Sequence, residues 1–141
     1  METLCTTSGG TRVLSYRRVA DRRDNAVALI IDEDLSTRAL LRLHLANAGY
    51  VVLEAMHAVQ GAYLALSASP ELILCDVGTC RLVSGDFLAA LKSGSTTRRS
   101  SLVLLTADPD ADRRSHELAG ASFLRKPVDA ERLLEMIEAA R

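Results

Sequence analysis

Acidic side chains follow two apolar runs of this 141-residue chain. Residues 26–31 are apolar and are followed by Asp32 and Glu33, and residues 72–75 are apolar and are followed by Asp76. Carboxylates that share one pocket repel one another and raise each other's pKa unless a cation lies among them. Oxygen ligands with room for water favour Mg²⁺ over a calcium cage. The pattern therefore predicts a magnesium site, provided that the fold brings these acids together.

Two further polar residues follow later apolar runs. Thr106 ends the run 101–105, and Lys126 comes shortly after residues 121–124. In phosphoryl transfer a metal and an ammonium neutralise phosphoryl oxygens, a hydroxyl donates a hydrogen bond, and a carboxylate can be the nucleophile. Each residue alone has an ordinary explanation, because an acid can simply cap a helix. Their joint placement after successive strands is what predicts phosphoryl chemistry.

These residues have to be positioned by strands that end at the same edge of a sheet. Predicted strands lie at residues 26–31, 50–54, 71–75, 101–105 and 121–124. Predicted helices lie at residues 36–48, 57–67 and 86–92, with a weak candidate at 110–118 and a last helix capped by Asp129. Such alternation with short connections requires a parallel sheet with helices on both faces. Ligands of these sheets bind beyond the carboxyl ends of the strands.

The apolar residues of two helices predict which face each helix buries. For the helix 57–67 the predicted inward residues are Val59, Ala62, Tyr63 and Leu66. For the last helix they are Leu133, Leu134, Ile137 and Ala140. Both sets follow the helical period.

The order and spacing of these residues resemble the CheY-like receiver domain of two-component response regulators. The resemblance rests on Asp32-Glu33, Asp76, Thr106-Ala107 and the stretch 123–127, and it covers residues 26–141. It implies an α/β, flavodoxin-like, doubly wound five-stranded parallel sheet of order 2-1-3-4-5 with helices on both faces. Residues 1–25, rich in Thr, Ser, Gly and Arg, are predicted to be a flexible N-terminal arm.

The resemblance also implies a phosphoacceptor and a metal. Asp76 would accept the phosphoryl group of a phosphohistidine, carried by a sensor histidine kinase or a histidine phosphotransfer protein. Mg²⁺ would be held by Asp32 or Glu33, by Asp76 and by the carbonyl of Gly78. Thr106 and Lys126 would contact the phosphoryl group.

The resemblance also implies how the domain would respond to phosphorylation. Phe123 would be the aromatic side chain that moves together with Thr106. Such a domain is a phospho-accepting signalling module rather than an enzyme, catalysing only its own phosphorylation and dephosphorylation. It would signal by binding a downstream protein or by passing its phosphate on in a phosphorelay. The chain ends at Arg141, directly after the last predicted helix, so no output domain is expected.

The sequence departs from the family pattern after Asp76. The loop 78–85 lacks the usual Met-Pro, and its glycine comes nine residues after the aspartate rather than eight. The segment from Thr106 to Lys126 is about two residues shorter than family members have. These departures keep open a pseudo-receiver, a module of the same fold that binds partners constitutively. A phosphatase of the haloacid dehalogenase type is a further alternative, because Asp32-x-Asp34 mimics its nucleophile motif.

Composition excludes several other classes of protein. A formal net charge of −1 gives no general attraction to nucleic acid or to anionic membranes. No apolar run approaches the roughly 18–20 residues of a membrane span. The three cysteines, Cys5, Cys75 and Cys80, have no metal-site spacing and favour a reduced, cytoplasmic setting, with Cys75 acting as a small apolar residue.

Overall fold

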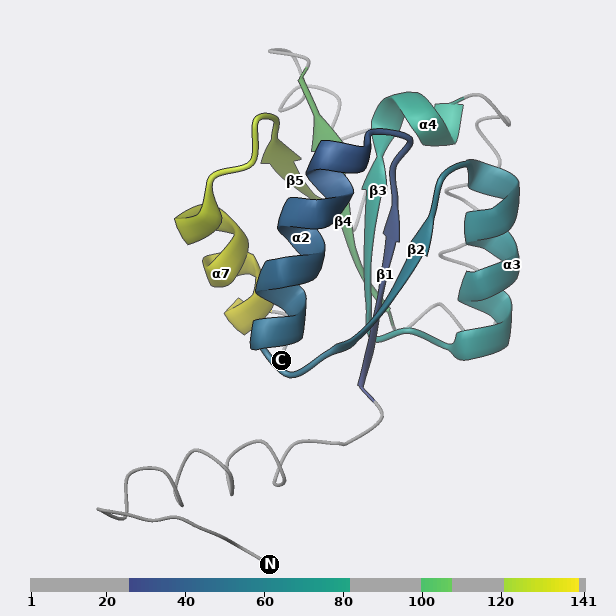
Figure 1. The fold of residues 1–141 in the computed structure, drawn as a ribbon, viewed down its shortest axis with the longest axis horizontal. Coiled ribbons are helices and arrows are strands. Elements are labelled where there is room, and N and C mark those ends of the chain that lie inside the picture. The colour runs from purple at the N-terminus through teal and green to yellow at the C-terminus, as the bar shows by residue number, and fades with distance from the viewer. Residues whose placement is uncertain (1–25, 82–99, 108–120, 140–141) are drawn as a thin grey trace, which may run out of the picture.

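Five parallel strands form one sheet in the order β2-β1-β3-β4-β5 (Figure 1). The structure, a computed structural model, describes residues 26–81, 100–107 and 121–139. The strands are β1 (Val27–Ile31), β2 (Val51–Ala55), β3 (Leu72–Asp76), β4 (Ser101–Thr106) and β5 (Ala121–Arg125). The described helices are α2 (Leu35–Asn47), α3 (Ala58–Ala68), α4 (Val77–Arg81) and α7 (Ala130–Ala139). The predicted fold class and strand order are confirmed.

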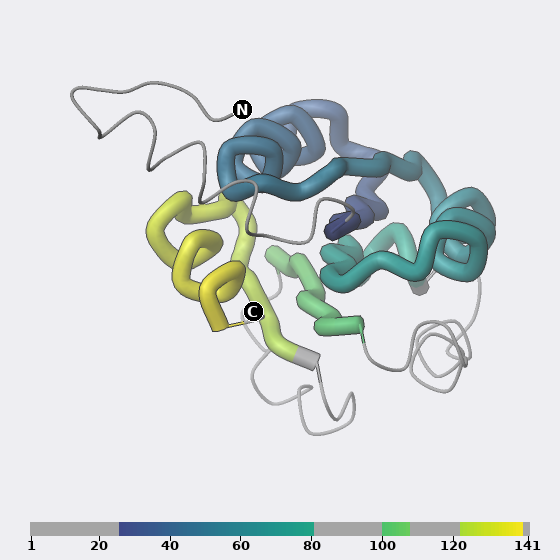
Figure 2. Tube along the Cα trace, turned by 90° about the horizontal axis from the view of Figure 1, so that it is seen from below, coloured from purple at the N-terminus to yellow at the C-terminus, as the bar shows by residue number. Residues whose placement is uncertain are grey.

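The central strands are buried on both sides because helices cover both faces of the sheet. On one face the core is closed by Leu41 and Leu45 of α2 and by Leu133 and Ile137 of α7. On the other face α3 closes a second core. Figure 2 shows α2 and α7 on one side of the strands and α3 on the other. This double covering explains why the central strands read as continuous apolar runs.

The register of the sheet brings the ends of its strands to one edge. β1 pairs with β3 so that Ile31 lies opposite Cys75. Asp76 is the last residue of β3, and β4 pairs with β5 so that Thr106 lies opposite Arg125. The polar residues at or just after these four ends therefore meet at the same edge, as the sequence predicted.

Helix α3 buries the opposite face from the one that the sequence predicted. Its buried residues are the small ones, Ala58, Gly61 and Ala65. The large residues Val59, Tyr63 and Leu66 are 68%, 71% and 58% exposed, and Ala62 is only partly buried. A Cβ on Gly61 would lie 2.6 Å from Cδ1 of Ile31, so the helix lies too close to β1 for a larger side chain. Closeness to the sheet, rather than hydrophobicity, decides which face points inward.

Two other expectations need correction. The segment after Asp76 was predicted to be a loop, whereas Val77–Arg81 forms the short helix α4. In α7, Leu134 is exposed rather than buried, while Leu133 and Ile137 are buried as predicted. The predicted helices at 86–92 and 110–118, and Ala140, lie outside the described residues. None of the described helices is both long enough and apolar enough to span a membrane.

Candidate functional site

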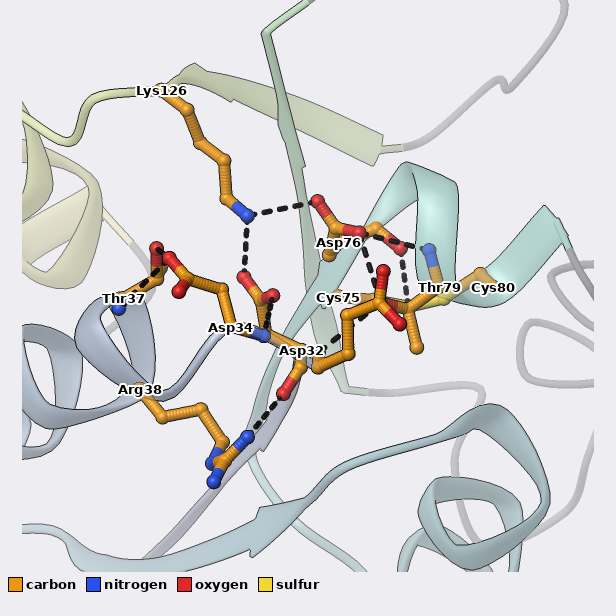
Figure 3. A network of polar contacts seen from close by, with 10 residues as sticks. Asp32, Asp34, Thr37, Arg38, Cys75, Asp76, Thr79, Cys80 and Lys126 are labelled. Carbon is orange, nitrogen blue, oxygen red and sulfur yellow. Dashed lines mark hydrogen bonds and ion pairs between the residues drawn. A yellow bond between two sulfur atoms is a disulfide. The ribbon is translucent and has the colours of Figure 1, made fainter.

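The ammonium of Lys126 joins the ends of three strands. Its Nζ lies 2.8 Å from Oδ2 of Asp32 and 3.0 Å from Oδ1 of Asp76 (Figure 3). The backbone N–H of Lys126 donates to the carbonyl of Thr106 at 2.7 Å, which fixes the end of β5 against β4. The sequence therefore predicted correctly that Lys126 and the two aspartates would lie together.

Asp32 is completely buried, which makes its charge costly unless it is balanced. Its Oδ1 accepts a hydrogen bond from the backbone N–H of Asp34 at 2.9 Å. Its Oδ2 is buried without a hydrogen bond of good geometry, and the Lys126 ammonium is the charge that faces it. A buried carboxylate oxygen of this kind is a position at which a cation is stabilised.

The electrostatics of the group favour a charged lysine. Burial by itself would lower the pKa of Lys126. The hydrogen bonds and negative charges of Asp32 and Asp76 outweigh burial and raise the pKa of this ammonium above its ordinary value. The lysine is therefore cationic throughout the neutral range.

A second cation contacts the backbone of the acidic loop, residues 32–34, which connects β1 to α2. The guanidinium of Arg38, buried on α2, donates from Nη1 to the carbonyl of Asp32 at 2.7 Å and from Nε to Oε1 of Glu54 at 3.1 Å. Arg42 donates to the other oxygen of Glu54 at 2.7 Å. Glu54 thus links both arginines of α2 to strand β2. This network, which the sequence pattern does not indicate, holds the backbone of Asp32 in place.

The phosphoacceptor candidate, Asp76, already has partners on both oxygens. Oδ1 faces Lys126, and Oδ2 accepts from the backbone N–H of Thr79 at 2.8 Å and from its hydroxyl at 2.9 Å. The same hydroxyl oxygen accepts a hydrogen bond from the backbone N–H of Glu33 at 3.3 Å. Thr79 is buried and connects the acidic loop to the acceptor. The sequence analysis missed Thr79, although an acid followed three residues later by Thr at a helix start is a capping spacing.

The other predicted residues occupy different positions around this group. Thr106 is buried at the end of β4 and lines, together with Phe123 of β5, a cavity of about 370 Å³. Glu33 and Gly78 are exposed, and Gly78 lies in α4, where a Cβ would be 3.2 Å from Oδ2 of Asp76. Within the described parts of the chain, no three acids, histidines or cysteines are grouped closely enough to hold a metal by themselves.

Asp34 does not belong to the group, although the phosphatase alternative would require it. Its carboxylate caps α2 by accepting from the backbone N–H and the hydroxyl of Thr37. The hydrogen bond from the Thr37 hydroxyl is the main reason that the pKa of Asp34 lies below its ordinary value. The second acid of the dehalogenase-like pair is thus used structurally.

Cys75 and Cys80, which the sequence analysis treated as separate thiols, are joined by a disulfide with 6.8 Å between their Cα atoms. The bond connects Cys75, the next-to-last residue of β3, to Cys80 of α4, so it closes a short loop of chain that contains Asp76 and Thr79. Both residues are buried, so Cys75 packs in the core as predicted. The prediction of two separate thiols was wrong because residues 77–81 form a helix and not a loop, and this helix brings Cys80 close to Cys75.

Most of the chain is similar in sequence to known proteins. Residues 28–138 match the family model described as response regulator receiver domain. Protein PilH of Pseudomonas aeruginosa is 30% identical over 113 residues, which cover 79% of this chain and 93% of PilH. The probable chemotaxis protein CheY of Rhizobium etli is 26% identical over 114 residues, which cover 79% of this chain and 88% of that protein.

Other relatives are longer. The DNA-binding dual master transcriptional regulator RpaA of Synechocystis is 30% identical over 113 residues, and the matched part is 47% of its length. This chain therefore spans about half of RpaA. Among solved structures, the chemotaxis response regulator CheY4 of Vibrio cholerae superposes with a TM-score of 0.72 at 24% identity, covering 83% of this chain and 99% of CheY4. At this identity the structural likeness establishes the fold.

Proposed function

This chain belongs to the response regulator receiver domain family, and from that premise we propose that Asp76 accepts a phosphoryl group from a phosphohistidine. In the transfer a P–N bond of the donor breaks and a bond from phosphorus to a carboxylate oxygen of Asp76 forms. Receiver domains are signalling domains, and the proposed outcome is a phosphorylated protein that binds a target or passes its phosphate on.

The observation that carries the proposal is the contact between Lys126 and Asp76. The ammonium lies 3.0 Å from Oδ1 of Asp76, so a phosphoryl group attached to that oxygen would lie within reach of a fixed positive charge. Preorganised charge of this kind stabilises the transition state of phosphoryl transfer. The neighbouring Asp32 keeps the lysine in place.

The residues also suit a magnesium ion. Carboxylate oxygens of Asp32 and Asp76 face each other across the ammonium of Lys126, and this ammonium is the charge that faces the buried Oδ2 of Asp32. Mg²⁺ commonly uses one or two carboxylates and keeps several waters, so it does not need a complete protein cage. We propose Asp32 and Asp76 as the principal ligands, with Glu33 and the Gly78 carbonyl at the rim. Bound there, the ion would neutralise part of the phosphoryl charge.

We propose that Thr106 and Phe123 change conformation when Asp76 is phosphorylated. Thr106 ends the strand beside β3, so its hydroxyl can donate to a phosphoryl oxygen. Phe123 lines the same cavity as Thr106, and its proposed movement is into this space. The partners proposed are a histidine kinase or histidine phosphotransfer protein and a downstream protein, in the cytoplasm, without nucleic acid or membrane.

One structural observation favours a second candidate function. Oδ2 of Asp76 accepts two hydrogen bonds from the buried Thr79, which stabilise the unphosphorylated carboxylate. A module whose acceptor stays occupied would bind its partner without phosphorylation, as a pseudo-receiver does. The two functions differ in whether the chain takes up phosphate.

Incubation with phosphoramidate or acetyl phosphate and Mg²⁺ tests the proposal. We expect the intact mass to rise by one phosphate, and we expect no rise in Asp76→Asn or when EDTA removes the metal. Asp34→Asn is the matched control, because it changes an exposed acid near the site and keeps a capping side chain. It should take up phosphate like the wild type.

Two other outcomes are informative. Phosphate that persists in Asp76→Asn would show a different acceptor and contradict the assignment. A wild-type protein that is folded and takes up no phosphate from either donor would favour the constitutive interaction module.

A further inference from the structure

Thr79 holds the acceptor carboxylate in a way that affects its chemistry. Both its backbone N–H and its hydroxyl donate to Oδ2 of Asp76, at 2.8 Å and 2.9 Å. The hydroxyl oxygen in turn accepts from the N–H of Glu33, which orients its proton toward Asp76. Because Thr79 is 1% exposed, water cannot readily replace these contacts. Figure 3 shows Thr79 on one side of Asp76 and Lys126 on the other.

The two oxygens of Asp76 therefore have different roles. Oδ2 accepts two hydrogen bonds from Thr79, whereas Oδ1 contacts only the ammonium of Lys126 among the described residues. Oδ1 is the oxygen that can form a bond to phosphorus while the contacts to Oδ2 stay in place. After transfer, Oδ2 is the carbonyl oxygen of the acyl phosphate and Thr79 still donates to it.

Loss of the phosphoryl group puts charge back on the carboxylate. A water oxygen forms a bond to phosphorus, the bond from phosphorus to Oδ1 breaks, and its electron pair stays on the carboxylate. Both protons of the water leave with the phosphate, so the products are the Asp76 carboxylate and inorganic phosphate (H2PO4−). Negative charge is then shared between Oδ1 and Oδ2. Hydrogen bonds to a charged acceptor are stronger than those to a neutral carbonyl.

We propose that the hydroxyl of Thr79 is a positioning group that shortens the lifetime of phosphorylated Asp76 by stabilising the departing carboxylate through Oδ2. The inference depends on the proposed phosphorylation of Asp76. By the same bonds Thr79 stabilises the free carboxylate before transfer, so it also slows phosphorylation. The hydroxyl thus shifts the balance toward the unphosphorylated protein.

The test uses full-length Thr79→Val and Thr79→Ser. Each protein is phosphorylated with phosphoramidate and Mg²⁺, the donor is removed, and the remaining phosphoprotein is followed by intact mass. Val keeps the shape and the backbone N–H and removes only the hydroxyl, so we expect its phosphorylated form to last about three to ten times longer than the wild type's. Ser restores the hydroxyl and should restore a lifetime close to that of the wild type.

Thr37→Val is the matched control, because it also removes a hydroxyl that donates to a carboxylate, that of Asp34, at a helix start. Its phosphoprotein lifetime should equal that of the wild type. If Thr79→Val does not fold, Thr79→Ala takes its place in the comparison with Thr79→Ser.

The possible failures are distinguishable. If the wild type takes up no phosphate on Asp76, the proposed function fails and the inference fails with it. If the wild type is phosphorylated and Thr79→Val decays at the same rate or faster, only the inference about Thr79 is wrong. A lifetime that is equally long in Thr79→Val and Thr79→Ser would also overturn it, since a loss of packing rather than of the hydroxyl would then be the cause.

Discussion

At the scale of single residues, Lys126 is the cation on which the arrangement of the acids depends. Asp32 is fully buried and the lysine side chain is 19% exposed, so the pair lies largely away from water. Removing one member of a buried ion pair leaves an uncompensated charge, which costs far more than the loss of a surface pair. Lys126 is therefore expected to contribute to folding as well as to chemistry.

Lys126→Ala should lower the free energy of unfolding at pH 7 by about 3 kcal/mol in the absence of divalent metal. Mg²⁺ should recover part of this loss, and it should stabilise the variant more than the wild type, because it supplies positive charge to the same oxygens. Urea unfolding with and without Mg²⁺ measures both effects. Arg132→Ala is the control, since it breaks an exposed pair with Glu135 and should change stability by less than about 0.5 kcal/mol.

The Lys126→Ala variant also tests how the contribution of Lys126 to stability depends on pH. The pKa of Lys126 is raised in the folded state above 10.5, its value without the protein environment. Its contribution is therefore complete below about pH 10.5 and is lost as the pH rises through the folded pKa. The stability difference between wild type and Lys126→Ala should stay constant from pH 7 to 10 and shrink at higher pH. A stability difference that also stays constant above pH 10, where the lysine loses its charge, would show that the charge of Lys126 does not stabilise the fold.

The chemistry-bearing residues could be predicted because they follow apolar runs, and parallel strands bring such positions together. Thr79 and Arg38 could not be predicted in the same way. Thr79 reaches Asp76 only because α4 begins directly after β3. Arg38 looks like any polar residue of a surface helix until the fold buries it against the carbonyl of Asp32.

At the scale of elements, α3 shows the limit of a hydrophobic pattern. Its eleven residues carry no charge, so apolar side chains lie on both its faces and the pattern does not show which one is buried. The larger residues were the ones predicted to lie in the core. The structure instead uses Ala58, Gly61 and Ala65, because small residues let the helix approach the sheet closely.

Two substitutions in α3 distinguish these orientations. Gly61→Ala should destabilise the protein by about 1–2 kcal/mol, because overpacking against Ile31 outweighs the better helix propensity of Ala. Val59→Ala should be neutral or slightly stabilising, because Val59 is exposed and Ala is the better helix former. Thermal and urea unfolding measure both. A loss of 2 kcal/mol or more in Val59→Ala, with none in Gly61→Ala, would support the orientation that the sequence suggested.

At the scale of the whole molecule, the sheet and its two cores are assembled, apart from the start of β1, from residues that lie within the family match. The match begins at residue 28 and β1 begins at Val27. The carbonyl of Ala26 accepts a hydrogen bond from the N–H of Val51, so the sheet starts there. We propose that the domain is residues 26–141 and that residues 1–25 are a separate arm.

A chain consisting of Met and residues 26–141 tests this division. We expect its melting temperature to be within about 2–3 °C of the full-length value, because residues 26–139 contain the five strands and the helices that close both described cores. It should also take up phosphate from phosphoramidate at the same rate. A fall of 10 °C, or a chain that no longer folds, would show that the arm is part of the domain.

The outer face of α3 also affects how this protein behaves in concentrated solution. With a net charge of −1, molecules repel one another only weakly. Val59, Tyr63 and Leu66 then present a short-range attractive surface on a helix that has no charge to oppose close approach. This helix face therefore favours self-association at high concentration, and solutions somewhat above neutral pH, where negative charge increases, will keep the protein better dispersed.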